Sequence, residues 1–351
     1  MTGSSAKLID VPELIELSRQ QPIIDVRSPG EFAQGHIPGA INVPLFDNDE
    51  RAEIGTLYKN AGRQPAVTRG LAIAGPKAND LVDAVKAIAA DGELIVHCWR
   101  GGMRSESFAW MLRQCELTPR VIIGGYKAFR RAAHAAFEQQ HNLVTLSGMS
   151  GSGKTQLLLA LREAGEQVLD LEGLANHRGS AFGGIGQPPQ PTVEQFENDL
   201  FLQWIAFDRE RPVWVESESQ LVGKVFVPNA VFEQMINSPA VVLQVDFERR
   251  AEFLVSVYGN YPSADFAESI EKIKKRLGGE RYKQAMDAVQ RRDVLEIARL
   301  ALNYYDSGYE KASKKWTHHV SVPFPLPIAG DVRCIDDLRR VGAELIAQKV
   351  V

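Results

Sequence analysis

Short apolar runs alternate with helical patterns along the first 138 residues of the chain. Runs of apolar residues predict strands, and apolar residues at helical spacing predict helices between them. The predicted strands are 22–26, 41–43 and 94–97. The predicted helices are 30–34, 79–90 and 105–113. Strands that alternate with helices indicate a parallel sheet with both faces covered.

A second α/β pattern follows a boundary near residue 140. The helical pattern at 126–138 runs into four polar residues, which predicts one domain over 8–138 and another over 142–351. Strands are predicted at 143–147, 167–170, 212–215 and 241–245, with a helix at 154–164. From Ser263 onward the pattern becomes helical and basic. The fold class is therefore α/β, with two parallel-sheet domains and a helical C-terminal segment.

Composition narrows the class of protein. The chain has 351 residues, 44% hydrophobic and 24% charged, which is ordinary for globular proteins and excludes wholesale disorder. The net charge of −4 excludes a uniformly basic nucleic-acid binder, so such a site needs a local patch. Three cysteines are too few for a disulfide scaffold. The N-terminus lacks the apolar run of a signal peptide, and no run is long enough to span a membrane. A two-domain cytoplasmic protein is expected.

Cys98 lies where a thiol can become reactive. It follows the strand at 94–97, and a glycine-rich loop with Arg100 and Arg104 leads from it into the next helix. Inward-facing N–H groups, the helix N-terminus and the two arginines should bind an anion and lower the pKa of the thiol. The alternative is a buried structural cysteine, which is how we interpret Cys115 and Cys334.

The segment 148–155 has the sequence of a phosphate-binding loop between a predicted strand and helix. Lys154 should reach the terminal phosphates of a di- or triphosphate, and Thr155 could hold Mg²⁺. The strand at 213–215 continues into Glu216 and Glu218 instead of the usual aspartate, so nucleotide hydrolysis is not predicted; the two glutamates lie near a metal or are solvated. The predicted phosphate-binding residues are Gly148, Ser150, Gly151, Ser152, Gly153, Lys154 and Thr155.

Two further segments carry candidate binding residues. In 170–183, at the carboxyl edge of the second sheet, His177, Arg178 and Ser180 suit an anion or a nucleotide, or form an ordinary polar loop. Residues 271–315 contain 12 Lys/Arg against seven Asp/Glu. This excess predicts contacts with a nucleic-acid backbone, or else a solvated helix face. The candidates there are Lys274, Lys275, Arg291 and Arg292.

Residues 25–44, from Asp25-Val-Arg to Ala-Ile-Asn-Val-Pro44, resemble the rhodanese-domain signature over nearly their whole length. In rhodaneses the active cysteine follows a later strand, as Cys98 does. Sulfurtransferases resemble C-R-x-G-x-R, whereas here His97 and Cys98 precede Arg104 by a longer loop, as in phosphatases that share the rhodanese fold. The longer loop implies room for a tetrahedral anion, so simple cyanide or thiosulfate sulfurtransfer is disfavoured.

The chain as a whole resembles the bacterial tRNA 2-selenouridine synthase family over about residues 8–345. The resemblance implies a rhodanese-like domain followed by a P-loop NTPase-like domain. Five segments carry it: 97–105, 124–130, 148–155, 171–180 and 304–306.

The resemblance also implies a reaction. The family acts on 2-thiouridine at the wobble position of certain tRNAs, converts it with geranyl diphosphate to S-geranyl-2-thiouridine, and then exchanges the geranylthio group for selenium from selenophosphate. The P-loop suits the diphosphate and the Cys98 loop suits selenophosphate, with Cys98 as the active-site cysteine, as an S-selanyl intermediate. Selenophosphate synthetase is an implied partner. No tightly bound cofactor, structural metal or membrane contact is expected, and Mg²⁺ remains an option.

Three alternatives stay open at this point. The first is a rhodanese-fold cysteine phosphatase fused to a kinase-like P-loop domain. The second is a persulfide-relay sulfurtransferase, which the length of the Cys98 loop disfavours. The third is a nucleotide-gated tRNA-binding module without chemistry, which a reactive Cys98 would exclude.

Overall fold

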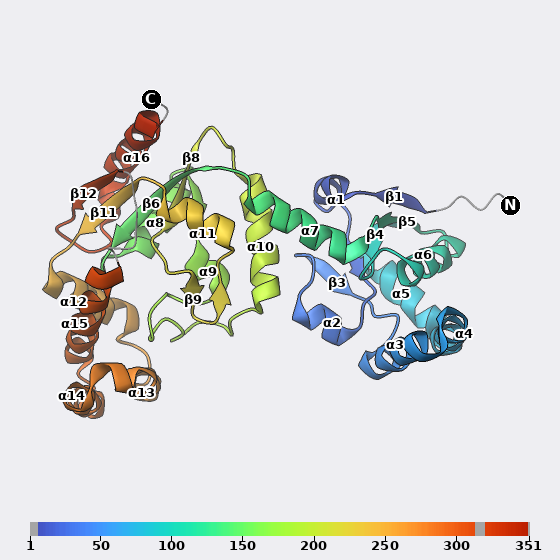
Figure 1. Cartoon of the computed structure of the whole chain (residues 1–351), viewed down its shortest axis with the longest axis horizontal. Helices are drawn as coiled ribbons and strands as arrows, with labels where there is room; N and C mark the ends of the chain where they lie inside the picture. Colours follow the sequence, from blue (N-terminus) through green and yellow to red (C-terminus); the bar gives the residue numbers. More distant parts are fainter. Residues whose placement is uncertain (1–5, 313–319, 350–351) are drawn as a thin grey trace. The chain divides into compact units, whose positions relative to one another are not determined.

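The computed structural model describes residues 6–312 and 320–349, which form two compact units, 1–136 and 137–351 (Figure 1). The division falls at the end of α7 (Gly125–Phe137), which corresponds to the helix predicted at 126–138. Each unit contains its own parallel sheet, as the sequence predicts.

The first unit is built on a five-stranded sheet in the order β1-β5-β4-β2-β3. All neighbouring strands are parallel, with Ile24 opposite both Ile41 and Val96. Adjacent residues such as Ile95 and Val96 are both buried, so both sheet faces are covered. The strands are β1 (Lys7–Ile9), β2 (Ile23–Asp25), β3 (Ala40–Asn42), β4 (Glu93–His97) and β5 (Thr118–Ile122).

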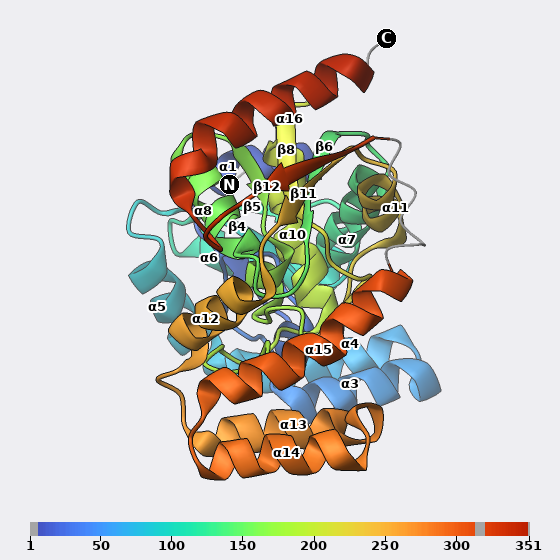
Figure 2. The ribbon, with the colours of Figure 1, turned by 90° about the vertical axis from the view of Figure 1, so that its left-hand side faces the viewer.

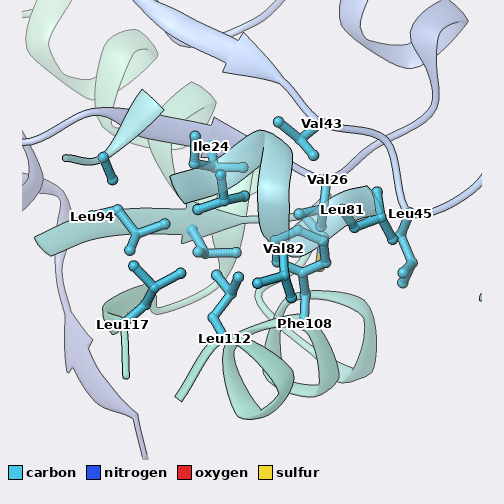
Figure 3. Close-up of a cluster of buried hydrophobic side chains, with 14 of the residues drawn as sticks. Ile24, Val26, Val43, Leu45, Leu81, Val82, Leu94, Phe108, Leu112 and Leu117 are labelled. Carbon is cyan, nitrogen blue, oxygen red and sulfur yellow. The ribbon is translucent and has the colours of Figure 1, made fainter. Parts of the chain in front are cut away.

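The helices of the first unit surround this sheet. Leucines and valines of α5 (Ala78–Ile88) join Phe108 and Leu112 of α6 (Met103–Gln114) in one core with β2 and β4 (Figure 3). Two helices that the sequence analysis did not predict, α3 (Asn48–Ala61) and α4 (Arg63–Ala74), pack against each other. The remaining helices are α1 (Val11–Leu17), α2 (Pro29–Gln34) and the 3₁₀ turn η1 (Gly75–Lys77).

The second unit has a five-stranded parallel sheet in the order β12-β11-β6-β8-β7. The expectation that everything after Ser263 is helical is wrong for β12 (Ser321–Pro325), which pairs with β11. Pro323 and Pro325 hide this strand in the sequence, yet an edge strand tolerates proline. The other strands are β6 (Asn142–Gly148), β7 (Gln167–Leu169), β8 (Pro212–Glu216) and β11 (Ala240–Gln244).

Helices α8 (Lys154–Glu163) and α16 (Ile335–Lys349) share a core with one face of this sheet, where Leu157, Leu161 and Leu338 are buried with Leu146. The remaining elements outside the helical group described next are α9 (Leu171–Ala175), α10 (Val193–Ala206), β9 (Leu221–Val222), β10 (Val225–Phe226), α11 (Asn229–Ile236) and η3 (Val332–Cys334).

Four helices form a separate group in the second unit: α12 (Phe247–Tyr258), α13 (Ser263–Leu277), α14 (Gly279–Gln290) and α15 (Val294–Ala312). Figure 2 shows α13, α14 and α15 lying side by side. Their common core includes Phe182 and Ile185, so the loop after α9 packs against them. Among the described residues, no helix is long and apolar enough to cross a membrane.

Candidate active sites

Cys98 directly follows β4, and two glycines allow its loop to lie against the turn that starts α7. A Cβ on Gly101 (φ +64°) would approach the carbonyl oxygen of Ile122 to 2.3 Å, and one on Gly125 (φ +59°) would approach that of Cys98 to 2.3 Å. The Tyr126 N–H donates to the Cys98 carbonyl at 2.9 Å. The backbone therefore holds the thiol in one place, with 4% of the residue exposed.

The contacts of Cys98 favour its thiolate. Burial by itself raises the pKa of the thiol, but the Ser105 hydroxyl, 3.3 Å from Sγ, the charge of Arg104 and the backbone N–H groups of Arg100 and Ser105 together lower it further. The net direction is downward, as the sequence predicts. A hydroxyl and a cation next to sulfur give a nucleophile or an anion-binding centre.

Arg104 is shared between the cradle and a carboxylate. Its Nη1 donates to Glu31 at 2.8 Å, and Arg51 of α3 lies 3.4 Å from the same carboxylate. The two arginines lower the pKa of Glu31, although burial opposes them. Arg104 is thus less available to an anion than the sequence suggests, and Arg51 adds a cation there.

The signature residues below the loop have a structural role. Asp25 and Arg27 form a fully buried ion pair at 2.7 Å, and the Arg27 guanidinium lies 3.9 Å from the centre of the Tyr126 ring. His97 Nε2 is 3.6 Å from Asp25, but burial lowers the His97 pKa, so the ring is neutral. These groups connect β2, β4 and α7 beneath Cys98.

The Cys98 pocket has a volume of about 480 Å³. Its lining is divided by chemistry: Arg51, Arg100 and Arg104 are cationic, and most of the other side chains are apolar. The apolar lining residues are Phe46, Ile54, Tyr58, Trp99 and Met103.

The segment 148–155 joins β6 to α8, which is the context that the motif requires. A Cβ on Gly153 (φ +84°) would meet the backbone of Gly330 at 2.3 Å, so the loop packs tightly against the segment before η3. Lys154 Nζ donates to the Gly148 carbonyl at 2.8 Å, folded over its own loop. Phosphate binding by these residues remains a prediction.

The carboxylates beside the P-loop are buried, in the case of Glu172 and Glu216, or half-buried, in the case of Glu218. Thr155 donates to Glu172 at 2.8 Å, and Glu216 Oε1 accepts from the Glu172 N–H at 2.7 Å. Burial, with Glu172 close by, raises the pKa of Glu218 to about 8. Burial also raises the pKa of Glu172 and of Glu216. The sequence analysis expects Glu216 and Glu218 to be solvated or near a metal. Glu216 is instead buried, and with a pKa of about 8 the half-buried Glu218 retains its proton at neutral pH.

The described residues include no group of three or more His, Cys, Asp or Glu side chains that could hold a metal ion. The Thr155 hydroxyl is an oxygen ligand of the kind that Mg²⁺ accepts. It would be available to an ion shared with a bound diphosphate only if its hydrogen bond to Glu172 were released.

The P-loop opens into a pocket of about 700 Å³. Of the predicted binding residues of this segment, Arg178 and Ser180 line the pocket, whereas His177 does not; their role in binding stays a prediction. The Arg178 guanidinium lies 5.5 Å from the centre of the Tyr258 ring. The segment 304–306 also belongs here: Tyr304 and Tyr305 line the pocket, and Asp306 pairs with Arg250 at 2.7 Å. The apolar lining residues are Leu159, Phe182, Phe253, Leu254, Val257, Phe266, Val294, Ile297, Ala298 and Ala301.

The basic candidates lie on the helical group and line neither pocket. Lys274 and Lys275 are exposed on α13, and Arg291 and Arg292 are exposed just after α14. Lys274 pairs with Glu271 at 3.0 Å, so part of the predicted charge excess is neutralised locally. Lys314 and Lys315, which also contribute to the predicted excess, lie outside the described residues.

The sequence analysis missed several residues of these sites. Glu31 and Ser105 were within quoted motifs but received no role, whereas Arg51 and Arg250 had no local signal. Glu172 lies in the quoted segment 171–180. Nothing in that segment indicates that its carboxylate accepts a hydrogen bond from Thr155. Of the apolar residues that line the P-loop pocket, the sequence analysis predicts only those in 154–164 and after Ser263, and only as part of a helical pattern.

Comparisons with known proteins agree with this architecture. The family described as the tRNA 2-selenouridine synthase AAA domain matches residues 141–323, and the rhodanese-like domain family matches residues 10–132. A tRNA 2-selenouridine synthase of Shewanella oneidensis is 33% identical, covering 86% of this chain and 88% of the relative. One from a Sulfurovum species is 36% identical, covering 82% and 88%. One from Bdellovibrio bacteriovorus is 32% identical, covering 91% and 96%. With two parallel-sheet domains and relatives aligned over most of its length, this chain belongs to the tRNA 2-selenouridine synthase family.

Proposed function

We propose that this chain replaces the sulfur of wobble 2-thiouridine in tRNA by selenium, through an S-geranyl-2-thiouridine intermediate. Geranyl diphosphate and selenophosphate are its co-substrates, and selenophosphate synthetase supplies the latter. Membership of the family supports selenium-dependent modification of tRNA as the reaction class. The chemistry of the two pockets supports the choice of co-substrates.

The observation that carries this proposal is the apolar lining of the P-loop pocket. The loop N–H groups and Lys154 suit a diphosphate, and Phe253, Val257 and Ile297 line the same pocket. A nucleotide places a polar ribose and base beyond its phosphates, whereas a prenyl diphosphate places hydrocarbon there. The pocket volume of about 700 Å³ also lies within the range of about 300–1,000 Å³ typical of small-molecule sites.

The first step is alkylation at sulfur. The thiocarbonyl sulfur forms a bond to C1 of the geranyl group, the bond from C1 to the diphosphate oxygen breaks, and the uracil N3 proton is lost. Negative charge develops on the departing diphosphate, where the P-loop amides, Lys154 and Arg178 can stabilise it. Alkylation also turns the sulfur into a better leaving group.

The second step takes place at the Cys98 pocket. Selenium of selenophosphate bonds to C2 of the base, the C2–S bond breaks, and geranyl thiolate leaves and takes up a proton. Water then attacks phosphorus, the Se–P bond breaks, and phosphate and 2-selenouridine remain. The loop amides, Arg100 and Arg104 suit the selenophosphate anion, and Cys98 is the active-site cysteine between them.

Reconstitution tests the proposal. The purified full chain is supplied with 2-thiouridine tRNA, geranyl diphosphate and selenophosphate, and the digested nucleosides are weighed by mass spectrometry. We expect 2-selenouridine with both co-substrates and S-geranyl-2-thiouridine when selenophosphate is omitted. Production of 2-selenouridine without geranyl diphosphate, or of no modified nucleoside at all, would overturn the proposal.

A further inference from the structure

We infer that the Cys98 pocket contains a binding site for the geranyl group of the S-geranyl intermediate. The apolar side of this pocket holds the hydrocarbon while the cationic side holds selenophosphate. The inference rests on the proposed function and assigns a role to α3, which the proposed function leaves without one. We call the five apolar lining residues, Phe46, Ile54, Tyr58, Trp99 and Met103, the apolar wall.

Helix α3 presents an uncovered face to this pocket. Arg51, Ile54, Gly55 and Tyr58 all line it, at the spacing that places residues on one side of a helix. None of the 14 residues of α3 is buried, which is unusual because a surface helix normally buries its apolar stripe against a core. Tyr58 is 56% exposed. The pocket face of α3 is therefore only partly covered: Ile54 packs against the edge of the first unit's core, whereas Tyr58 stays largely open.

The loop residues extend the same surface next to the thiol. Trp99 and Met103 are 36% and 39% exposed, whereas Cys98 is 4% exposed. Large apolar side chains that surround a buried, activated sulfur form a site for an apolar ligand. In a site for selenophosphate alone, polar side chains would be expected at these positions.

Gly55 leaves space at the centre of the α3 face. A Cβ there would meet only the flexible end of Arg51, at 2.7 Å from Nη1. Glycine inside a helix is destabilising relative to alanine. Its position on the pocket side of α3 keeps the space between Ile54 and Tyr58 open for a ligand.

The charges opposite the apolar wall complete the match. Arg51, Arg100 and Arg104 line the other part of the pocket, and Glu31 offsets only part of their charge. In the selenation step a hydrocarbon chain and a phosphate-like anion meet at one carbon atom of the base. The apolar side of the Cys98 pocket matches the hydrocarbon chain, and its cationic side matches the phosphate-like anion.

Single-turnover selenation of two prepared tRNAs tests this inference. One carries S-geranyl-2-thiouridine and the other S-methyl-2-thiouridine, and both are given to the full chain with selenophosphate. Each buried methylene contributes about fourfold to binding. We therefore expect wild type to prefer the geranyl substrate at least tenfold in kcat/KM.

Two kinds of variant should remove this preference, because they should lower kcat/KM for the S-geranyl tRNA at least tenfold more than for the S-methyl tRNA. Ile54→Ser combined with Tyr58→Ser removes apolar surface, and Gly55→Leu fills the space with an apolar side chain. Leu71→Ser is the matched control, because Leu71 is an exposed leucine of α4 outside the pocket. An unchanged preference in both pocket variants would overturn the inference.

A binding measurement keeps the inference separate from catalysis. Geranyl thiol should protect Cys98 of wild type from iodoacetamide, and should protect the Ile54→Ser/Tyr58→Ser variant at least tenfold less well. Failure of geranyl thiol to protect wild type would also overturn the inference. If wild type is protected but converts neither tRNA, the proposed function fails and the hydrocarbon site stands.

Discussion

Cys98 and Cys334 are two thiols in opposite environments. The Ser105 hydroxyl, the charge of Arg104 and two backbone N–H groups together outweigh burial and lower the pKa of Cys98, whereas burial and the nearby charge of Asp331 raise that of Cys334. A thiol with a lowered pKa exists more fully as thiolate at neutral pH, and the thiolate is the reactive form.

Iodoacetamide should therefore label Cys98 at a pH below about 8.5, the ordinary pKa of a cysteine thiol. Peptide mass spectrometry of the labelled chain gives the rate at each cysteine as pH is raised. Ser105→Ala should move the labelling of Cys98 to higher pH, because it removes the hydroxyl 3.3 Å from Sγ. Phosphate or selenophosphate should slow labelling. Equal pH profiles for Cys98 and Cys334 would contradict this assignment.

Glu218 links proton binding to the stability of the second unit. Its pKa is about 8 in the folded chain against an ordinary value of 4.5, so the folded state binds a proton that the unfolded state releases between these values. Stability should accordingly fall as pH rises through this window, by at most about 1.4 kcal/mol per pH unit. Glu218→Gln should flatten the dependence of the urea midpoint on pH. Identical slopes for variant and wild type would mean that Glu218 is ionised throughout.

At the scale of the elements, the P-loop and the basic helices are proposed to bind different ligands: the P-loop binds the diphosphate, and the helices bind tRNA. Lys154→Ala should abolish formation of S-geranyl-2-thiouridine, because it removes the side chain that reaches the diphosphate. Affinity for tRNA and selenation of a prepared S-geranyl tRNA should stay close to wild type. Mass spectrometry of nucleosides and a filter-binding titration measure these quantities. Normal geranylation by the variant would show that the loop binds another ligand.

The exposed cations near α13 and α14 are the proposed contacts with tRNA phosphates. Each lost contact should reduce the slope of log affinity against log salt by roughly 0.7–0.9. Arg291→Ala with Arg292→Gly should show this effect cleanly, since Arg292 has φ +56°, which glycine adopts without strain.

On α13, Lys275→Ala should reduce the slope more than Lys274→Ala, because Lys274 already pairs with Glu271. Titrations of tRNA binding at several salt concentrations measure each slope. Unchanged slopes in all these variants would identify a solvated helix face.

The elements also show where periodicity succeeds as a guide. It predicts α5 because that helix buries a regular apolar stripe, and a continuous apolar run predicts β4, which is buried on both faces of the sheet. It misses α3, which buries no residue, and β12, whose two prolines are tolerated only because the strand lies at an edge. In both cases the neighbours decide the structure, and the local sequence does not show them.

At the level of the whole molecule, the Cys98 pocket lies in the first unit and the P-loop pocket in the second, and the proposed steps divide between them. Cys98→Ala should stop selenium incorporation and let S-geranyl-2-thiouridine accumulate. Arg104→Ala should act in the same direction but less completely, because Arg100 and the loop amides remain. Reactions with both co-substrates, followed by nucleoside mass spectrometry, measure the two products. Normal 2-selenouridine from Cys98→Ala would make the cysteine structural, and loss of both products would show that the steps are coupled.

The two reactive loops could be predicted because their chemistry is local. Cys98 and the P-loop each lie between a strand and a helix within a few residues, so glycines, cations and helix N-termini all come from one short segment. The parallel α/β class is equally local, since it follows from alternation of strand and helix patterns.

Only the tertiary structure could decide what faces those loops. Arg51 and Arg104 meet at Glu31, and Thr155 meets Glu172, through contacts between separate elements. The apolar lining of the P-loop pocket comes mainly from α12, α13 and α15, which begin about a hundred residues or more after the loop. The local sequence does not show that these groups meet, even where they lie in a motif or a helical pattern, because their approach depends on how the helices pack over the sheet.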